Sequence, residues 1–386
     1  LLRGFAMWRN ALDHERAAFD CAAGSLEQAL PGFYLAQDRW SPAPTASDVF
    51  RNDWRDVKFL FHQATNTAHS HSYVRNREYL VRVLNHWVAR GVDGFRLDHS
   101  TDFNNGLSTE FWRYVLAKVN HYAALRGQDR PVYLAEEFFT QDGMADLVDI
   151  LTEGYVTDIT ARRGQTKDAG RVEWVLANAE RFNGRANVMA ALETHDEHRL
   201  TEGTGFDVWT GAGFHGLGLT AHTTPMVLMG QPLGSHAGVG FKRSTLLEAR
   251  FADHDLDPLV EFYGALHHAR RAHANRALRA APRHFLRTAE GNVDQRIFAQ
   301  VKWSGDGNVV FVVHNLWPGA VQQRYVIPPH IADALWLRAG RDYRLVDVFT
   351  EQPMGACRDG GALAQDLFVA LAADERLQWL RLEVCD

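Results

Sequence analysis

Hydrophobic residues recur at two spacings along this chain, and the spacing changes near residue 285. Before that point, short apolar runs alternate with segments whose hydrophobic residues return every three or four positions, as on one face of a helix. This order of strand and helix is typical of a parallel sheet with right-handed crossovers. After residue 285, an alternating segment and a short apolar run are joined by turn residues, which predicts antiparallel strands.

The first region is predicted to begin irregularly and then to alternate strands with helices. Residues 1–74 contain a helical piece around 5–30 and a loop rich in Pro and Asp. Beyond them, the pattern predicts helices near 73–90, 108–127, 168–182, 211–221 and 259–266. It predicts strands at 94–98, 131–138, 187–193 and 224–230, and a further strand within 147–160.

The second region is predicted to be a β domain of about a hundred residues, 286–386. Residues 296–302 alternate, residues 304–308 form a hairpin signal, and the apolar run 309–313 provides the returning strand. Further strands are expected at 322–327, 342–349 and 378–384. We expect these strands to form an antiparallel β-sandwich.

The stretch Gly91–His99 carries two opposite charges inside a predicted strand. Gly91 ends the preceding helix, and from Gly94 the side chains alternate between the two faces of the strand. Arg96 and Asp98 therefore share one face, and they must be paired or hydrated there because burying either charge alone is unfavourable. Taken alone, this pattern is more typical of a structural ion pair than of a functional site.

Two further stretches change that interpretation. Residues 94–98, 131–138 and 189–196 resemble, in the same order, three conserved regions of the α-amylase family, glycoside hydrolase family 13. The resemblance extends over most of the chain. It implies a (β/α)₈ TIM barrel followed by an antiparallel all-β C-terminal domain. The family's first region is not found, so we expect a partial catalytic barrel over 1–285 that lacks its N-terminal strands, with the remnant of an inserted loop at 1–74.

The resemblance also implies the residues of the active site. Asp98 corresponds to the nucleophile, Glu136 to the general acid/base, and Asp196 to the carboxylate that holds the sugar hydroxyls. Arg96 and His195 are expected to bind the nucleophile and the substrate. In a barrel enzyme these residues lie at the C-terminal ends of the strands, where the catalytic loops meet. Retention requires the two catalytic carboxyl groups to be about 5–5.5 Å apart.

Two glutamates compete for the role of general acid. Glu136 and Glu137 point to opposite faces of the predicted strand, so only one should face the substrate. The pattern of a small residue followed by Glu favours Glu136. A third glutamate, Glu193, occupies a strand position where its charge needs a partner, for which we expect Arg199, and its role is predicted to be structural.

The function that the resemblance implies is a retaining glycoside hydrolase acting on α-glucosidic bonds of an α-glucan or maltooligosaccharide. There are two alternatives: a transglycosylase or isomerase of the same family, and a non-catalytic barrel that is retained only for binding. No metal or cofactor is predicted. Many α-amylases have Lys-His where this chain has Thr101 and Asp102, so a calcium site is possible in the family but not supported by these residues.

Composition narrows the class of partner. The net charge of −6 argues against nucleic acid or an anionic membrane surface, and no apolar run is long enough for a transmembrane helix. Cys21, Cys357 and Cys385 are too few for a disulfide framework, match no metal site, and favour a cytoplasmic location. The first three strands of the barrel are expected to be absent from this chain, so residues 1–386 alone are expected to be poorly soluble or inactive.

Overall fold

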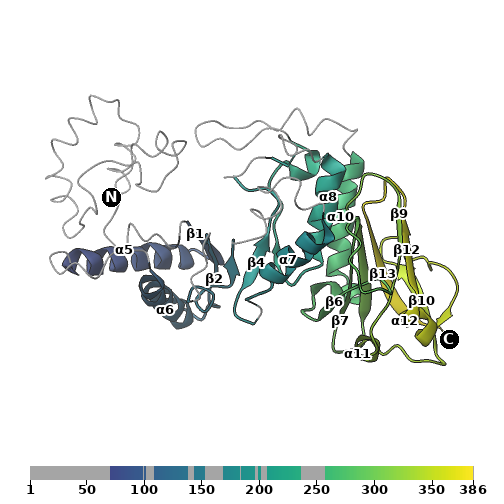
Figure 1. The fold of residues 1–386 in the computed structure, drawn as a ribbon. Helices are drawn as coiled ribbons and strands as arrows, with labels where there is room; N and C mark the ends of the chain where they lie inside the picture. Colours follow the sequence, from purple (N-terminus) through teal and green to yellow (C-terminus); the bar gives the residue numbers. More distant parts are fainter. Residues whose placement is uncertain are drawn as a thin grey trace. The chain divides into compact units, whose positions relative to one another are not determined.

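A computed structural model of the chain (Figure 1) describes residues 70–98, 100, 108–137, 143–152, 168–182, 184–195, 199–200, 207–235 and 257–385. Contacts divide the chain into two compact units, Leu1–Leu151 and Thr152–Asp386. The predicted helical piece at 5–30, most of the predicted insertion remnant and the apolar run at 155–159 lie outside the described residues. The predicted domain boundary at 285/286 stays a prediction.

The first unit contains two helices and three short parallel strands. Their bounds are α5 Ser70–Val88, β1 Gly94–Leu97, α6 Thr109–Leu125, β2 Val132–Ala135 and β3 Ile150–Leu151. Strand β1 pairs with β2, and β2 pairs with β3, all in the parallel sense. The chain thus runs from strand through helix to the neighbouring parallel strand, as the sequence pattern predicted.

Local sequence signals explain where these helices begin and end. Gly91, three residues after α5, has a φ of +86°, a conformation that glycine adopts without strain. At the start of α6 the Ser108 side chain accepts a hydrogen bond from the backbone N–H of Phe111, as expected of an N-cap. The predicted apolar face of α6 is buried at Phe111, Val115 and Val119.

The second unit begins with the same alternation. Its first elements are α7 Ala169–Ala179, β4 Asn187–Ala190, α8 Val208–Leu219, β5 Thr224–Pro225, η4 Gln231–Leu233, α10 Asp257–Arg271 and η6 His273–Arg279. Strands β4 and β5 pair in parallel, with Met189 opposite Thr224. The helices are close to those predicted, whereas the last parallel strand has two residues in place of the seven expected.

An antiparallel domain follows, with one large sheet and one small one. Its elements are β6 Arg283–Phe285, β7 Ile297–Trp303, β8 Val309–Asn315, β9 Val321–Tyr325, α11 Pro329–Ala334, β10 Asp342–Asp347, β11 Arg358–Asp359, α12 Gly360–Gln365, β12 Leu367–Leu371 and β13 Leu377–Val384. Six strands form a sheet in the order β11-β10-β13-β8-β7-β6, and β12 pairs with β9. Parallel strands followed by this domain agree with a partial barrel and a β domain.

The large sheet is buried on both faces. Phe311 and Val313 of β8 pack with Tyr325 of β9 and Val369 of β12, which makes a two-layer core. The alternate residues Val310 and Val312 pack against α8, α10 and η6. Figure 1 shows α8 and α10 beside the antiparallel sheet. Burial on both faces explains why β8 is apolar from Val309 to Val313.

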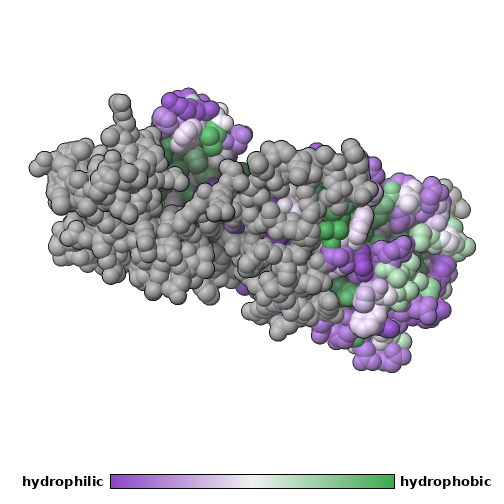
Figure 2. Space-filling model, turned by 90° about the horizontal axis from the view of Figure 1, so that it is seen from above, coloured by the Kyte–Doolittle hydropathy of each residue, from purple (hydrophilic) through white to green (hydrophobic). Residues whose placement is uncertain are grey.

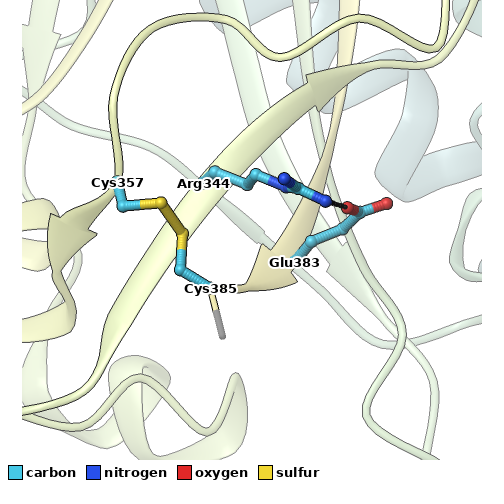
Figure 3. Close-up of a disulfide and its surroundings, with 4 residues drawn as sticks. All are labelled: Arg344, Cys357, Glu383 and Cys385. Carbon is cyan, nitrogen blue, oxygen red and sulfur yellow. Dashed lines mark hydrogen bonds and ion pairs between the residues drawn. A yellow bond between two sulfur atoms is a disulfide. The ribbon is translucent and has the colours of Figure 1, made fainter.

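A disulfide joins Cys357 to Cys385, two of the three cysteines that were predicted to form no disulfide framework (Figure 3). Cys357 precedes β11 and Cys385 follows β13, and these two strands flank β10. Sheet topology therefore brings the two Cα atoms to 6.3 Å although 28 residues separate them in sequence. The cysteines consequently no longer favour a reducing compartment. On the same edge, Arg344 of β10 and Glu383 of β13 form a cross-strand ion pair.

The surface over the antiparallel domain is mainly hydrophilic in Figure 2, with hydrophobic side chains in small patches. Several large aromatic side chains are nevertheless exposed in the described parts of the chain, among them Trp317 and Trp336. No helix among the described residues has both the length and the apolar character that a membrane span requires.

Candidate active site

The two strands β1 and β2 place alternate side chains on shared faces. Their parallel register sets Arg96 opposite Leu134 and Phe95 opposite Tyr133, so even-numbered residues of both strands point to one side. On the odd-numbered side the rings of Phe95 and Tyr133 are stacked, with centroids 6.3 Å apart. Tyr133 also donates a hydrogen bond to Asn120 of α6, so α6 covers this face. The charged residues occupy the opposite face.

Gly94 allows the two strands to approach closely. A Cβ atom at this position would lie 2.5 Å from the backbone carbonyl oxygen of Val132, which no side chain tolerates without a shift of the backbone. The glycine at the start of the Gly-Phe-Arg stretch is therefore required by packing between β1 and β2. Its effect on the site is to fix the register that aligns Arg96 with the end of β2.

Arg96 contacts both candidate catalytic carboxylates. Its Nη1 pairs with Asp98 Oδ1, and its Nη2 lies 2.7 Å from Glu136 Oε1. The three side chains differ in exposure: 33% for Arg96, 66% for Asp98 and 9% for Glu136. One guanidinium thus holds an exposed carboxylate and a buried carboxylate on one face, at the C-terminal ends of neighbouring parallel strands. The predicted sharing of a face by Arg96 and Asp98 is confirmed.

Glu137 has a different environment. Its side chain is fully buried, and its Oε2 accepts a hydrogen bond from Ser100 Oγ at 3.2 Å. Ser100 also donates from Oγ and from its backbone N–H to the carbonyl oxygen of Glu136, at 2.8 and 3.1 Å. Trp112 of α6 donates its indole N–H to the carbonyl oxygen of Ser100. Glu137 therefore anchors the loop after β1, and Glu136 is the glutamate that meets Arg96.

This arrangement fits the chemistry that two carboxylates perform together. A carboxylate held by Arg96 and open to solvent can reach a bound substrate, whereas a neighbouring buried carboxyl group can exchange a proton with it. Barrel enzymes carry their reacting groups at the C-terminal ends of strands, where Asp98 and Glu136 lie. The roles themselves stay predictions.

The third predicted region lies in the second unit, after β4. His195 is exposed, and Asp196 lies outside the described residues. The predicted partnership of Glu193 is confirmed: its Oε2 lies 2.7 Å from Arg199 Nη1, and its Oε1 accepts from the backbone N–H of Leu200. Arg199 also donates to the carbonyl oxygen of Met229 at 2.8 Å. This pair is buried and structural.

Metal binding finds no support in the described part of the chain. Those residues contain no group of three or more His, Cys, Asp or Glu side chains that could hold a metal ion. Thr101 and Asp102, which bear on the calcium question, lie outside the described residues. The prediction of no metal remains a prediction.

A pocket that the sequence did not predict lies within the second unit. It has a volume of about 150 Å³ between α8 and the segment that follows β8, and Asp207, Trp317 and Arg376 contribute to its wall. These residues come from segments far apart in the chain and belong to no recognisable motif. Only the folded structure brings them together.

Comparison with known proteins identifies the fold. No family model matches the chain, and no curated protein matches it by sequence. Among solved structures, it is similar to the noncanonic maltogenic α-amylase AmyB from Thermotoga neapolitana, with a TM-score of 0.65 and 14% identity. The match covers 94% of this chain and 74% of that enzyme.

Two further structures show the same similarity. The α-amylase of Geobacillus thermoleovorans, solved as a complex with acarbose, has a TM-score of 0.59 at 13% identity, with 80% of this chain and 64% of that one covered. The debranching enzyme of Nostoc punctiforme, soaked with acarbose, has a TM-score of 0.58 at 14% identity, with 90% and 68% covered. The fold is therefore similar to that of these α-amylase and debranching enzymes, and the parallel strands followed by an antiparallel domain agree with a partial barrel and a β domain. This chain spans about two thirds to three quarters of their length.

Proposed function

We propose that this protein cleaves α-glucosidic bonds of maltooligosaccharides or α-glucans by a double displacement with retention of configuration. The observation that carries the proposal is the single guanidinium of Arg96, which contacts both Asp98 and Glu136 on one face of β1 and β2. The similarity in fold to an α-amylase and a debranching enzyme that were solved with acarbose supports the choice of substrate.

In the first step, a carboxylate oxygen of Asp98 attacks the anomeric carbon while the bond from that carbon to the leaving oxygen breaks. Glu136 donates its proton to the departing oxygen, which leaves as an alcohol, and the sugar remains as an ester of Asp98. Arg96 orients Asp98 and balances its charge before the attack. Its planar guanidinium presents a separate nitrogen to each carboxylate in a fixed geometry, which the ammonium group of a lysine does not provide.

In the second step, a water molecule attacks the same carbon and transfers a proton to Glu136 as the ester bond to Asp98 breaks. Two inversions leave the configuration unchanged. An acceptor sugar in place of water gives transfer, which needs the same two carboxylates. Analysis of the products from maltotriose therefore distinguishes hydrolysis from transglycosylation.

Asp196 and His195 are proposed to bind the sugar ring from the loop after β4. The proposal rests on the resemblance of residues 189–196 to the family's third matching region. An aspartate and a histidine side by side supply acceptors and a donor for neighbouring hydroxyl groups.

The experiment compares Glu136→Gln with Glu137→Gln. On maltotriose, Glu136→Gln should lower kcat by about 10²–10⁴-fold because the proton for the leaving oxygen is lost. On an aryl maltoside whose leaving group needs no proton, the loss should be much smaller. Glu137→Gln should retain kcat because Gln can still accept from Ser100.

Nuclear magnetic resonance of the first product completes this test, since retention releases the α-anomer before mutarotation. The opposite ranking of the two glutamine variants would assign the acid to Glu137. A β-anomer as first product would rule out double displacement.

A further inference from the structure

A second place in the molecule combines an exposed aromatic ring with opposite charges. The pocket between α8 and the segment after β8, here called the α8 pocket, is lined by Asp207, Thr210, Phe214, His314, Trp317 and Arg376 among others. None of these residues belongs to the strands that carry Asp98 and Glu136. We propose that the α8 pocket binds one sugar ring of a saccharide chain.

Trp317 is held as a rigid platform. Its backbone N–H donates to Asn315 Oδ1 at 2.9 Å, and its carbonyl oxygen accepts from Arg376 Nη1 at 3.2 Å. A Cβ atom at Gly319 would lie 3.3 Å from Cδ1 of the indole, so the glycine leaves room for the ring to lie against the backbone. With its backbone fixed, Trp317 still exposes 52% of its surface. An exposed, immobilised indole offers an apolar face to a ligand at low entropic cost.

Arg376 has unused hydrogen-bonding capacity at the same place. Its side chain is only 18% exposed, and its buried Nε has no hydrogen-bond partner among the described residues. Its Nη2 lies 3.9 Å from Asp207 Oδ2, beyond hydrogen-bonding distance. Because Asp207 is too far from Nη2 for a hydrogen bond, a ligand oxygen that accepts from Nη2 would form a charge-assisted hydrogen bond.

Asp207 supplies acceptors opposite this cation. Its two carboxylate oxygens accept from the backbone N–H and the hydroxyl of Thr210, at 2.7 and 3.0 Å, which fixes the side chain as the N-cap of α8. Each carboxylate oxygen has a further lone pair, and the side chain is 59% exposed. It can therefore accept from a ligand hydroxyl while it caps the helix.

The charges determine the class of ligand. One guanidinium faces one carboxylate, and burial lowers the pKa of His314 to about 3, so this histidine adds no charge. The pocket is thus electrically balanced and favours a neutral molecule with both donors and acceptors. A pyranose ring has these properties: hydroxyl groups around its edge, and an apolar face of C–H groups that fits the indole.

The size of the pocket limits the ligand to one ring. Its volume of about 150 Å³ is below the roughly 300–1,000 Å³ of pockets that enclose drug-sized molecules. The rest of a longer saccharide would lie in solvent beside Trp317. That the saccharide is an α-glucan rests on the proposed function; that it is a sugar rests on the pocket.

Calorimetric titration with maltotriose tests the proposal, with Asp98→Asn present in every chain to stop turnover. Trp317→Ala should weaken the binding of maltotriose at the α8 pocket by roughly tenfold or more, as expected when an aromatic anchor is truncated. Trp336→Ala is the matched control, because Trp336 is another exposed tryptophan of the same domain that does not line the pocket. It should bind as the parent does.

A second variant guards against loss of folding. Asp207→Asn retains an N-cap of equal quality for α8 but removes the charge, so it should fold normally and bind more weakly by a few fold. Binding that is identical in the parent, Trp317→Ala and Asp207→Asn, or absent from the parent, would overturn the proposal.

The two proposals fail in different ways. If binding depends on Trp317 but turnover does not depend on Asp98, the α8 pocket is supported as a sugar site and the proposed function is wrong. If turnover depends on Asp98 but binding does not depend on Trp317, the proposed function is supported and the α8 pocket is not a sugar site.

Discussion

Two arginines of this protein hold glutamates near the ends of parallel strands, and they do so in opposite ways. Arg96 divides its guanidinium between Asp98 and Glu136, and 66% of the Asp98 side chain remains exposed. Arg199 and Glu193 are closed to solvent, with 2% and 3% of their side chains exposed. The chemical groups are the same, and only their surroundings differ.

The difference lies in what remains available to a ligand. Around Glu193, one oxygen faces Arg199 and the other accepts from Leu200, while Arg199 also donates to Met229. The protein itself uses these groups, so the pair stabilises the turn after β4. Around Arg96, an exposed carboxylate stays accessible. Burial and internal hydrogen bonding thus separate a structural pair from a candidate active site.

Asp98→Asn should show the largest effect. An amide cannot attack the anomeric carbon, so kcat on maltotriose should fall on the order of 10⁴-fold or more, as for the loss of other nucleophiles. The free energy of unfolding should change by less than about 1 kcal/mol because the ion pair is largely exposed. Asp93→Asn, an exposed aspartate just before β1, is the control for turnover. Normal turnover in Asp98→Asn would show that Asp98 is not the nucleophile.

Glu193→Ala should lower stability and leave turnover unchanged, the opposite of Asp98→Asn. Removing the carboxylate leaves Arg199 buried without its ionic partner, so the free energy of unfolding should fall by about 3–5 kcal/mol, measured by urea denaturation. Turnover per folded molecule should be retained. The double variant Glu193→Leu/Arg199→Met replaces the pair with apolar groups and should recover much of the loss. A single variant as stable as the parent would show that the pair is not structural.

Lys302 is an intermediate case, because it is fully buried and its Nζ lies 3.9 Å from Glu180 Oε1, too far for a hydrogen bond. Burial lowers the pKa of Lys302 to about 7 from 10.5, so in the range between these values the unfolded chain holds the proton more tightly. The free energy of unfolding should therefore rise with pH across this window. Below it, both states are protonated and the unfavourable burial is fully present.

Lys302→Met should consequently stabilise the protein by about 2 kcal/mol at pH 6, and by less at pH 10. Urea denaturation at the two pH values measures the difference. Lys118→Met, which changes an exposed lysine of α6, should show no such dependence on pH. An equal effect of Lys302→Met at both pH values would contradict the assigned cause.

Arg96→Lys should have the smallest effect of the four. A lysine ammonium is a point charge on a flexible stem and does not orient two carboxylates at once. We expect kcat to fall by about tenfold, with stability within about 1 kcal/mol of the parent. Unchanged kcat would show that the shared guanidinium is not needed to position Asp98.

Local patterns predicted the parts of this structure that local physics determines. Alternation along β1 placed Arg96 and Asp98 on one face, Ser108 marked the start of α6, and Glu193 found its partner Arg199 six residues later. Each of these depends on residues close together in sequence. Strand parity also separated Glu136 from Glu137, although both turned out to be buried.

The rest depends on contacts between distant segments. The disulfide forms because β11 and β13 lie on either side of β10, a topology that no spacing of cysteines reveals. The β9–β12 ribbon pairs strands that are separated in sequence by α11, β10, β11 and α12, and the predicted strand at 322–327 gave no sign of its partner. Asp207, Trp317 and Arg376 are far apart in sequence and meet at the α8 pocket only in the folded structure.

The position of β13 in the sheet has a consequence for the synthesis of the protein. Although it is the last strand in sequence, β13 lies between β8 and β10, near the middle of the six-stranded sheet. A ribosome makes proteins from the N-terminus at about 5–20 residues per second, so β7, β8 and β10 emerge before the strand that joins them. Until β13 follows, an edge of β8 and an edge of β10 are unpaired and open to association with other chains. Chaperones that shield such edges during translation should therefore raise the yield of this protein.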